Sequence, residues 1–142
     1  MLPYVHVPPA CVHAAAEKYD IPVEILYSVV VTEGGRPGML KRNKNGSFDM
    51  GVMQINTKTW GPKLYVYFPK KALIEDPCAS VYAGAYIIAK ERAETKDGSI
   101  WRAVARYHSR NPKYQIPYLH KVRRIYYRIK SEFKKIMLAK NN

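Results

Sequence analysis

The sequence predicts a mainly helical fold: a bundle of helices around one buried central helix, with a small β-hairpin or loop region beside it. Three observations predict this fold. Apolar residues recur at helical spacing along most of the chain, one segment is apolar almost all round, and a polar stretch containing Asn45-Gly46, a dipeptide typical of tight turns, interrupts the helices. Because 142 residues is the length of one domain, we interpret residues 1–142 as a single domain.

Two helices are expected before the turn region. The first spans about residues 9–19, and Asp20 is the expected N-cap of the second. The second helix should end at Gly34-Gly35, because glycine readily adopts the left-handed conformation that terminates a helix. Glu33 is then its last or next-to-last residue. One apolar side of this helix is expected to comprise Val23, Leu26, Tyr27, Val30 and Val31.

The polar stretch over residues 36–50 is expected to hold a small hairpin or irregular ribbon, after which residues 48–55 return to the core. A weaker helical stretch around Trp60 and Tyr65 follows. It is interrupted by prolines, so it should be short.

Three helices are expected in the second half of the chain. Asp76-Pro77 provides an N-cap and a first-turn proline for the buried central helix, and Ser99 caps a short helix. The last helix, about residues 117–139, carries an apolar stripe of Val122, Ile125, Ile129, Phe133 and Ile136.

The net charge of +13 indicates an anionic partner: a nucleic acid, a membrane face or an acidic polymer. Nucleic acid is not expected, because no helix-turn-helix, zinc-finger or RNA-binding signature accompanies the charge. The basic residues of the last helix form either a solvated outer face or a docking surface for an anionic polymer or acidic partner. They are Lys121, Arg123, Arg124, Arg128, Lys130, Lys134, Lys135 and Lys140.

No apolar run approaches the roughly 18 residues of a membrane span. Residues 1–9 lack the basic and apolar regions of a secretory signal, so either the protein stays inside or a signal has been removed. Cys11 and Cys78 are too few and too far apart for a zinc site. They are either two buried thiols or one disulfide, and a disulfide would indicate an oxidising compartment.

Several chemistries are excluded, because the chain contains no GxSxG, HExxH, P-loop or GxGxxG motif and its four histidines lack metal-ligand spacing. No metal or organic cofactor is implied. Glu33 is the candidate acid. Apolar neighbours and the negative end of a helix dipole both disfavour its charged form and should raise its pKa, as a general acid requires. A glutamate at an arbitrary helix end is more often a surface residue, so the surrounding motifs decide.

Four blocks follow in order. Residues 51–56 read Gly-Val-Met-Gln-Ile-Asn, Asp76-Pro77-Cys78 precedes an apolar helix, Trp101 precedes Tyr107-His108-Ser109, and Tyr118 comes after them. With Glu33 at a helix end, these blocks resemble the lysozyme-like lytic transglycosylases (SLT domain) of the secretion- and conjugation-associated type. The cysteine pair fits that subset. The resemblance covers roughly residues 9–130 and implies a lysozyme-like α+β fold with a glycan-binding cleft.

The resemblance implies cleavage of the β-1,4 bond between N-acetylmuramic acid and N-acetylglucosamine in peptidoglycan, with Glu33 as the single acid/base and 1,6-anhydromuramyl products. It implies that Met53 and Gln54 line the cleft and that the Tyr107 hydroxyl approaches Glu33; plain core packing is the alternative for Met53 and Tyr107. His108 and Tyr118 complete the implied substrate-binding set. Partners would be glycan strands and components of a secretion, pilus or conjugation machine. The implied location is periplasmic or extracytoplasmic.

Two departures from the family pattern stand out: Gly34 replaces a frequent serine, and His108 replaces a frequent asparagine. Asp49 lies in a segment that also resembles the one carrying the second carboxylate of animal-type lysozymes. It either binds loop amides or serves as a second catalytic carboxylate in a muramidase that hydrolyses the same bond. A non-catalytic peptidoglycan-binding module and a nucleic-acid binder are the remaining alternatives.

Overall fold

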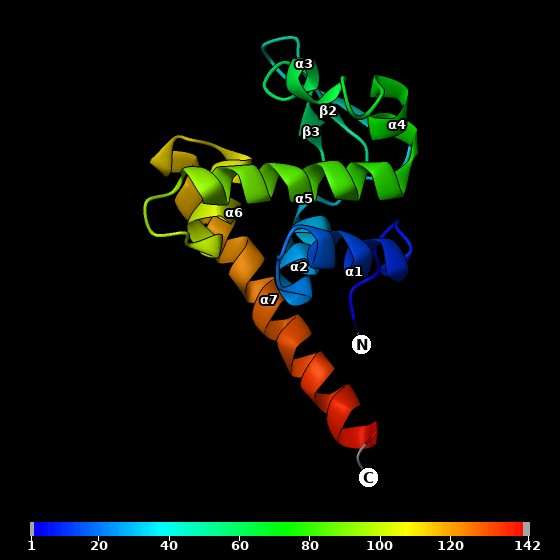
Figure 1. The fold of residues 1–142 in the computed structure, drawn as a ribbon, viewed down its shortest axis with the longest axis vertical. Helices are drawn as coiled ribbons and strands as arrows, with labels where there is room; N and C mark the ends of the chain where they lie inside the picture. Colours follow the sequence, from blue (N-terminus) through cyan, green and yellow to red (C-terminus); the bar gives the residue numbers. More distant parts are fainter. Residues whose placement is uncertain (1, 141–142) are drawn as a thin grey trace.

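The computed structural model describes residues 2–140 and confirms a mainly helical fold with a small antiparallel sheet, consistent with a lysozyme-like architecture (Figure 1). Helix α5 crosses the molecule, with the strands, α3 and α4 on one side and α1 and α2 on the other. The helices are α1 (Pro9–Lys18), α2 (Val23–Glu33), α3 (Gly61–Leu64), α4 (Lys70–Glu75), α5 (Pro77–Glu94), α6 (Ile100–His108) and α7 (Pro112–Lys140). The strands are β1 (Leu40–Arg42), β2 (Phe48–Met50) and β3 (Ile55–Asn56).

Helix α5 is the buried central helix that the sequence predicts. The Asp76 carboxylate caps its start by accepting the backbone N–H groups of Cys78 at 3.0 Å and Ala79 at 3.2 Å. Helices α1, α4 and α6 all pack against it. Its buried residues lie on several sides of the helix, as expected for a core helix: Ser80, Val81, Ala83, Gly84, Ala85, Ile87, Ile88 and Glu91.

Helix α2 ends where the glycine pair predicts. Gly34 is the C-cap, with a left-handed φ of 66°, and Glu33 is the last helical residue. The predicted apolar side is only partly right, because α7 and the N-terminal segment also cover the helix; the Tyr27 hydroxyl donates to the Pro3 carbonyl. The buried residues of α2 are Ile25, Leu26, Ser28, Val29 and Val30.

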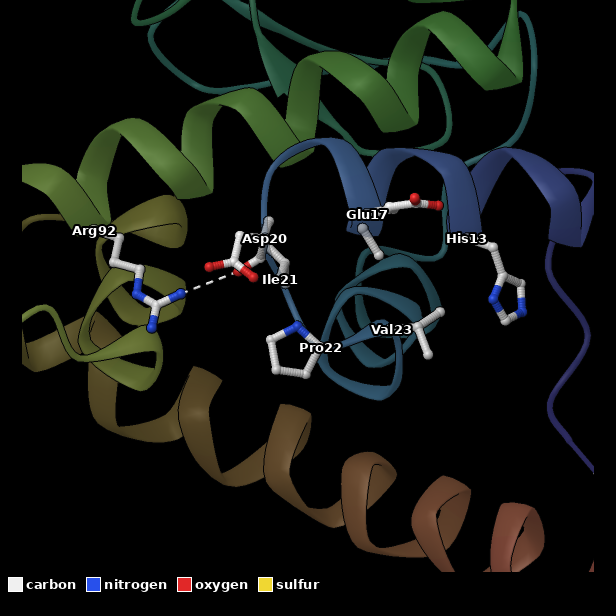
Figure 2. A pocket seen from close by; sticks show the side chains of 8 residues that line it. His13, Glu17, Asp20, Ile21, Pro22, Val23 and Arg92 are labelled. Atoms are coloured by element: carbon white, nitrogen blue, oxygen red, sulfur yellow. Dashed lines mark hydrogen bonds between the residues drawn. The ribbon is translucent and has the colours of Figure 1, made fainter. Parts of the chain in front are cut away.

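The predicted N-cap of α2 is wrong. The helix starts after Pro22, whose carbonyl accepts the first helical N–H groups, and Asp20 instead turns the chain with a φ of 53°. The Asp20 carbonyl accepts a hydrogen bond from the Arg92 guanidinium at 3.1 Å, which ties the turn to α5 (Figure 2). The fixed φ of a proline suits the entrance of a helix, so Pro22 determines the boundary that we assigned to Asp20.

The expected hairpin is present. Strands β1 and β2 pair antiparallel with Leu40 opposite Met50, and β3 pairs with β2 so that Asn56 lies opposite Asp49. The turn between β1 and β2 contains Gly46, at a φ of 83°. This register places Asp49 and Asn56 side by side on the sheet.

Helix α7 begins earlier than predicted, at Pro112 instead of about residue 117, so that Pro117 lies inside it. The Asn111 carbonyl accepts the N–H groups of Tyr114 and Gln115, so one turn forms ahead of the proline. Of the predicted apolar stripe, Val122 and Ile129 are buried, Ile125 and Phe133 are half-buried and Ile136 is exposed.

Cys11 and Cys78 form a disulfide that joins α1 to the first turn of α5, with their Cα atoms 5.4 Å apart. Closing a loop of 67 residues stabilises the fold by about 4 kcal/mol in the chain-entropy model. Disulfides are typical of proteins that fold in oxidising compartments. Within residues 2–140, no helix has both the length and the apolar character needed to cross a membrane.

Candidate active site

The candidate site is a cleft of about 1000 Å³, which we call the Glu33 cleft. The C-terminal end of α2 contributes one part of its wall, the strands and their turn another, and the end of α6 with the start of α7 a third. The predicted residues that line it are Glu33, Asp49, Gln54, Tyr107, His108 and Tyr118. Folding therefore brings together residues that are up to 85 positions apart in the chain.

Two glycines hold Glu33 against the sheet. Gly34 ends α2, and Gly35 then passes so close to the backbone after β2 that a Cβ at this position would lie 1.9 Å from the Gly51 carbonyl oxygen. No side chain fits there without moving the backbone. The close approach fixes the distance between the end of α2, which carries Glu33, and β2, which carries Asp49.

The Glu33 side chain is half-buried in the wall of the cleft, and the pKa of its carboxyl is raised from 4.5 to about 7. Desolvation is the largest cause, and the nearby charge of Asp49 also raises the pKa. Two contacts act in the opposite direction: the Tyr118 hydroxyl donates to Glu33 Oε2 at 2.5 Å, and Lys41 contributes a positive charge. Near neutral pH the carboxyl can therefore exist in both protonation states, as acid/base catalysis requires.

Asp49 is held by a small network of amides. The side-chain amides of Asn43 and Asn56 donate to Asp49 Oδ1 at 3.1 and 3.0 Å. The same two amides also donate to the Ser47 hydroxyl, whose own proton is donated to the Asn45 side chain. Asp49 thus binds loop amides, as one sequence interpretation expected, and still lines the cleft close enough to raise the pKa of Glu33.

His108 and Tyr118 line the part of the cleft that α6 and α7 contribute. Their rings stack with centroids 4.2 Å apart and an interplanar angle of 2°. Partial burial lowers the pKa of His108, so the imidazole is largely neutral near pH 7. The stack orients the Tyr118 hydroxyl toward Glu33.

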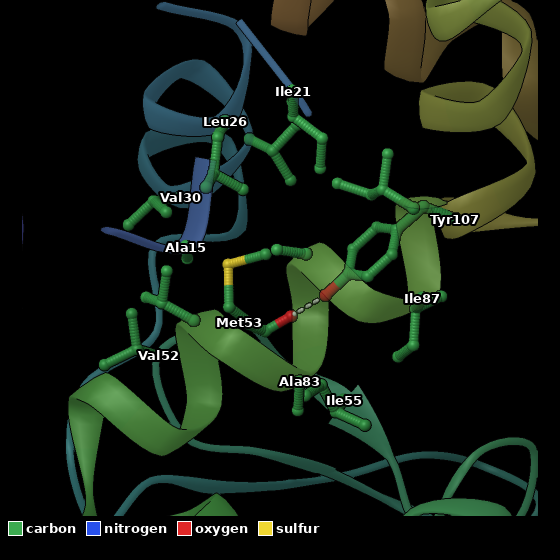
Figure 3. Packing of buried hydrophobic residues seen from close by; sticks show 14 of the residues in the cluster. Ala15, Ile21, Leu26, Val30, Val52, Met53, Ile55, Ala83, Ile87 and Tyr107 are labelled. Atoms are coloured by element: carbon green, nitrogen blue, oxygen red, sulfur yellow. Dashed lines mark hydrogen bonds between the residues drawn. The ribbon is translucent and has the colours of Figure 1, made fainter. Parts of the chain in front are cut away.

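One predicted placement is wrong. The Met53 side chain does not line the cleft: it is fully buried and packs over Gly84, where an added Cβ would lie 2.4 Å from Met53 Cε. Tyr107 lines the cleft, and its hydroxyl donates to the Met53 carbonyl at 2.7 Å (Figure 3). The hydroxyl that donates to Glu33 is that of Tyr118. Gln54 does line the cleft, with a φ of 53° and its side-chain amide bound to the Gly51 carbonyl.

An ionic network that the sequence did not predict lies under the α6 wall. Glu91 is a fully buried carboxylate on α5, and it accepts Arg106 Nε at 2.7 Å and Arg110 Nη2 at 2.9 Å. Both arginines line the cleft, and in the sequence they flank Tyr107 and His108, which also line it. Glu91 lies in the charged end of α5, between Lys90 and Arg92, where the local sequence does not distinguish it from a surface acid. Asn43 and Asn56 were also missed, although they lie in the quoted turn region.

No metal site accompanies these groups: among the residues that the structure describes, no cluster of three or more His, Cys, Asp or Glu side chains could hold an ion. A family model described as the transglycosylase SLT domain matches residues 10–112. The chain belongs to this family. The matched region of the SLT domain contains Glu33, Asp49, Gln54 and His108, and Tyr118 lies just beyond it.

Three relatives illustrate the similarity. Invasion protein IagB of Salmonella typhimurium is 33% identical over 100 residues, which are 70% of this chain and 61% of that protein. Protein IpgF of Shigella flexneri is 30% identical over 129 residues, covering 87% of this chain and 84% of that protein. X polypeptide of Escherichia coli is 28% identical over 128 residues, covering 85% and 75%. This chain therefore spans only 61% of the length of IagB.

Proposed function

We propose that this SLT-domain chain is a peptidoglycan lytic transglycosylase, which cleaves the β-1,4 bond between N-acetylmuramic acid and N-acetylglucosamine and leaves a 1,6-anhydromuramyl end. The observation that carries the proposal is the Glu33 carboxyl, which lines a cleft of about 1000 Å³ and has a pKa raised to about 7. One such group can donate a proton and then accept one.

In the first step, protonated Glu33 donates its proton to the glycosidic oxygen. The bond between that oxygen and the muramyl C1 breaks, the electron pair stays with the leaving oxygen, and positive charge develops at C1. The negative charge of Asp49 faces the same cleft and favours this oxocarbenium-like state. Its two amide contacts keep the carboxylate in place during the step.

In the second step, the Glu33 carboxylate takes the proton from the muramyl 6-hydroxyl while that oxygen bonds to C1. The anhydro ring closes, Glu33 is protonated again, and no water is consumed. Tyr118 stabilises the carboxylate form of Glu33 through its 2.5 Å hydrogen bond. Gln54 and His108 line the cleft with polar groups that can bind the sugars.

A muramidase that hydrolyses the same bond is the second candidate. Asp49 favours it, because this carboxylate lies close enough to Glu33 to raise its pKa and could act as a second carboxylate. A non-catalytic peptidoglycan-binding module is a third candidate, and it gives no reason for an acid with a raised pKa in the cleft.

Purified peptidoglycan sacculi test the proposal. Wild-type protein should clear them, and Glu33→Gln should clear at least about a hundredfold more slowly because it can donate no proton from this position. Glu75→Gln, on the exposed face of α4, is the matched control and should clear normally. Mass spectrometry of the released muropeptides should detect anhydro ends.

The outcomes separate the candidates. Reducing ends, heavier by one water, would replace the transglycosylase by the hydrolase and assign Asp49 as its second carboxylate. Equal, negligible clearing by the wild type and by Glu33→Gln would leave only a binding module.

We place this cleavage outside the cytoplasm, in the periplasm, as local wall remodelling for a secretion, pilus or conjugation machine. The Cys11–Cys78 disulfide and the similarity to Invasion protein IagB support this placement. Exported forms of this chain, produced in Salmonella typhimurium lacking IagB, provide the test. Wild type should restore invasion and Glu33→Gln should not.

A further inference from the structure

The last turns of α7 carry apolar side chains that the fold leaves uncovered. Ile129 is fully buried, but seven residues later the exposed fractions are 42% for Ile136, 58% for Met137 and 56% for Leu138. These three consecutive residues project in directions 100° apart around the helix, so together they span more than half of its circumference. The tip of α7 is therefore apolar on more than one side.

This tip extends beyond the rest of the molecule. Figure 1, drawn with the longest axis vertical, shows α7 leaving α6 and continuing past α1 and α2 to the lower end of the structure. The strands and α3 lie at the opposite end of that axis. A partner that binds the tip of α7 would therefore contact the molecule at the end remote from the sheet.

Cationic side chains surround the apolar residues. Along α7, Lys130 and Lys134 lie on one side of the line through Ile129 and Ile136, and Arg128 and Lys135 lie on the other. All four cations are exposed. From residue 121 to residue 139 the sequence has one acidic residue, Glu132, which lies 3.6 Å from Lys135. Long basic side chains can lay their methylene groups along an apolar surface while the charged ends stay in a polar layer.

We propose that the tip of α7 docks on a phospholipid bilayer with anionic headgroups: Ile136, Met137 and Leu138 enter the boundary between headgroups and acyl chains, and the flanking cations bind the lipid phosphates. A fluid bilayer accommodates apolar side chains that point in several directions, whereas a groove on a protein covers one face of a helix. The cations supply charge complementarity. In this pose the sheet, which forms one wall of the Glu33 cleft, points away from the bilayer.

Vesicle sedimentation tests the docking with the whole chain. Vesicles of phosphatidylcholine mixed with phosphatidylglycerol should bind the protein, and pure phosphatidylcholine vesicles should bind it far more weakly. The triple variant Ile136→Gln, Met137→Gln, Leu138→Gln keeps every charge, and its affinity for the anionic vesicles should fall about tenfold. The double variant Val66→Gln, Tyr67→Gln removes apolar side chains that are even more exposed, 79% and 71%, from a different surface and should bind as wild type does.

A second readout locates the contact. The Met137→Trp variant should show an additional blue-shifted fluorescence component on anionic vesicles, relative to wild type. Circular dichroism should be the same for all variants, which establishes that they fold. Unchanged vesicle binding by the triple variant would overturn the proposal, since charge alone would then explain it. Equal binding to neutral vesicles, no binding to any vesicle, or preferential binding to poly-glutamate, which would indicate an acidic protein partner, would also overturn it.

Discussion

At the scale of single residues, the contacts of Glu33 predict its pH dependence. The first step needs the protonated carboxyl, so the rate of peptidoglycan cleavage should fall as the pH rises through about 7. The Tyr118 hydrogen bond lowers the pKa of Glu33, so Tyr118→Phe should move this decline to higher pH. Tyr107→Phe is the matched control, because its hydroxyl binds the Met53 carbonyl and should leave the midpoint unchanged. A wild-type midpoint near 4.5 would contradict the burial of Glu33.

The same pKa predicts a pH-dependent stability. Folding raises the pKa of Glu33 from 4.5 to about 7, so the folded state binds the proton more tightly than the unfolded state, and stability is lost as the pH rises from about 4.5 to about 7. Glu33→Gln carries no such proton. Above pH 7 its free energy of unfolding should exceed that of wild type by up to about 3 kcal/mol, and below pH 4.5 the two should agree.

Urea unfolding at both pH values measures this difference. Glu75→Gln, which alters an exposed carboxyl, should follow wild type throughout. A Glu33→Gln variant that is less stable than wild type above pH 7 would show that the charged carboxylate is favoured by the fold and would contradict the raised pKa.

The sequence could place Glu33 but not its neighbours. A helix end is readable because Gly34 provides a local, left-handed signal. Which tyrosine reaches the carboxyl depends on how α6 and α7 pack, and no local pattern contains that information. The hydroxyl of Tyr118 makes the hydrogen bond to Glu33, whereas the sequence indicates only the approach of Tyr107. The catalytic and binding roles assigned to these residues stay predictions.

At the scale of elements, the approach of α2 to the sheet should be sensitive to one methyl group. A Cβ on Gly35 would lie 1.9 Å from the Gly51 carbonyl oxygen and 2.7 Å from that of Val52. Gly35→Ala should therefore separate the end of α2 from β2, destabilise the fold by about 3 kcal/mol and impair cleavage by moving Glu33 away from Asp49.

Gly46→Ala is the control within the same region. Nothing lies within 4 Å of a Cβ at Gly46, so the variant bears only the strain of a positive φ, about 1 kcal/mol, and should keep its activity. Thermal unfolding and sacculus clearing measure both variants. Equal effects would mean that backbone conformation, and not the close packing at Gly35, governs this region.

Helix boundaries were predictable where one side chain decides them. Asp76 and Ser99 cap their helices through the hydrogen bonds that their residue types predict. The errors came from prolines: Pro22 begins α2 in place of the Asp20 cap, and Pro117 lies inside α7. In each case a backbone carbonyl, that of Pro22 or that of Asn111, accepts the first N–H groups of the helix. A rule based on residue type alone does not predict these hydrogen bonds. Met53 lies in the turn between β2 and β3, where no periodic pattern shows which side chains face the core, so the sequence could not decide between the cleft and the core for it.

At the scale of the whole molecule, the net charge of +13 suits the proposed function. The substrate, peptidoglycan, is an insoluble polymer that carries carboxylates, and a positive protein is attracted to it. Glu33 and Asp49 share the cleft with cations from β1 and its turn, from α6 and from the start of α7 with the connection before it, namely Lys41, Lys44, Arg106, Arg110 and Lys121. The overall charge therefore acts at longer range, on the adhesion of the protein to the wall, while the two carboxyls act at the bond.

This difference in range predicts how salt affects adhesion to the wall and binding in the cleft. Raising the salt concentration from about 0.1 M to about 1 M shortens the screening length from about 10 Å to about 3 Å, so adhesion of the inactive Glu33→Gln variant to sacculi should weaken severalfold. Binding of an uncharged chito-oligosaccharide, which meets the cleft alone, should change little over the same range. Sedimentation measures the first and calorimetry the second. Sacculus binding that salt leaves unchanged would show that contacts within the cleft, and not the surplus of positive charge, hold the protein to the wall.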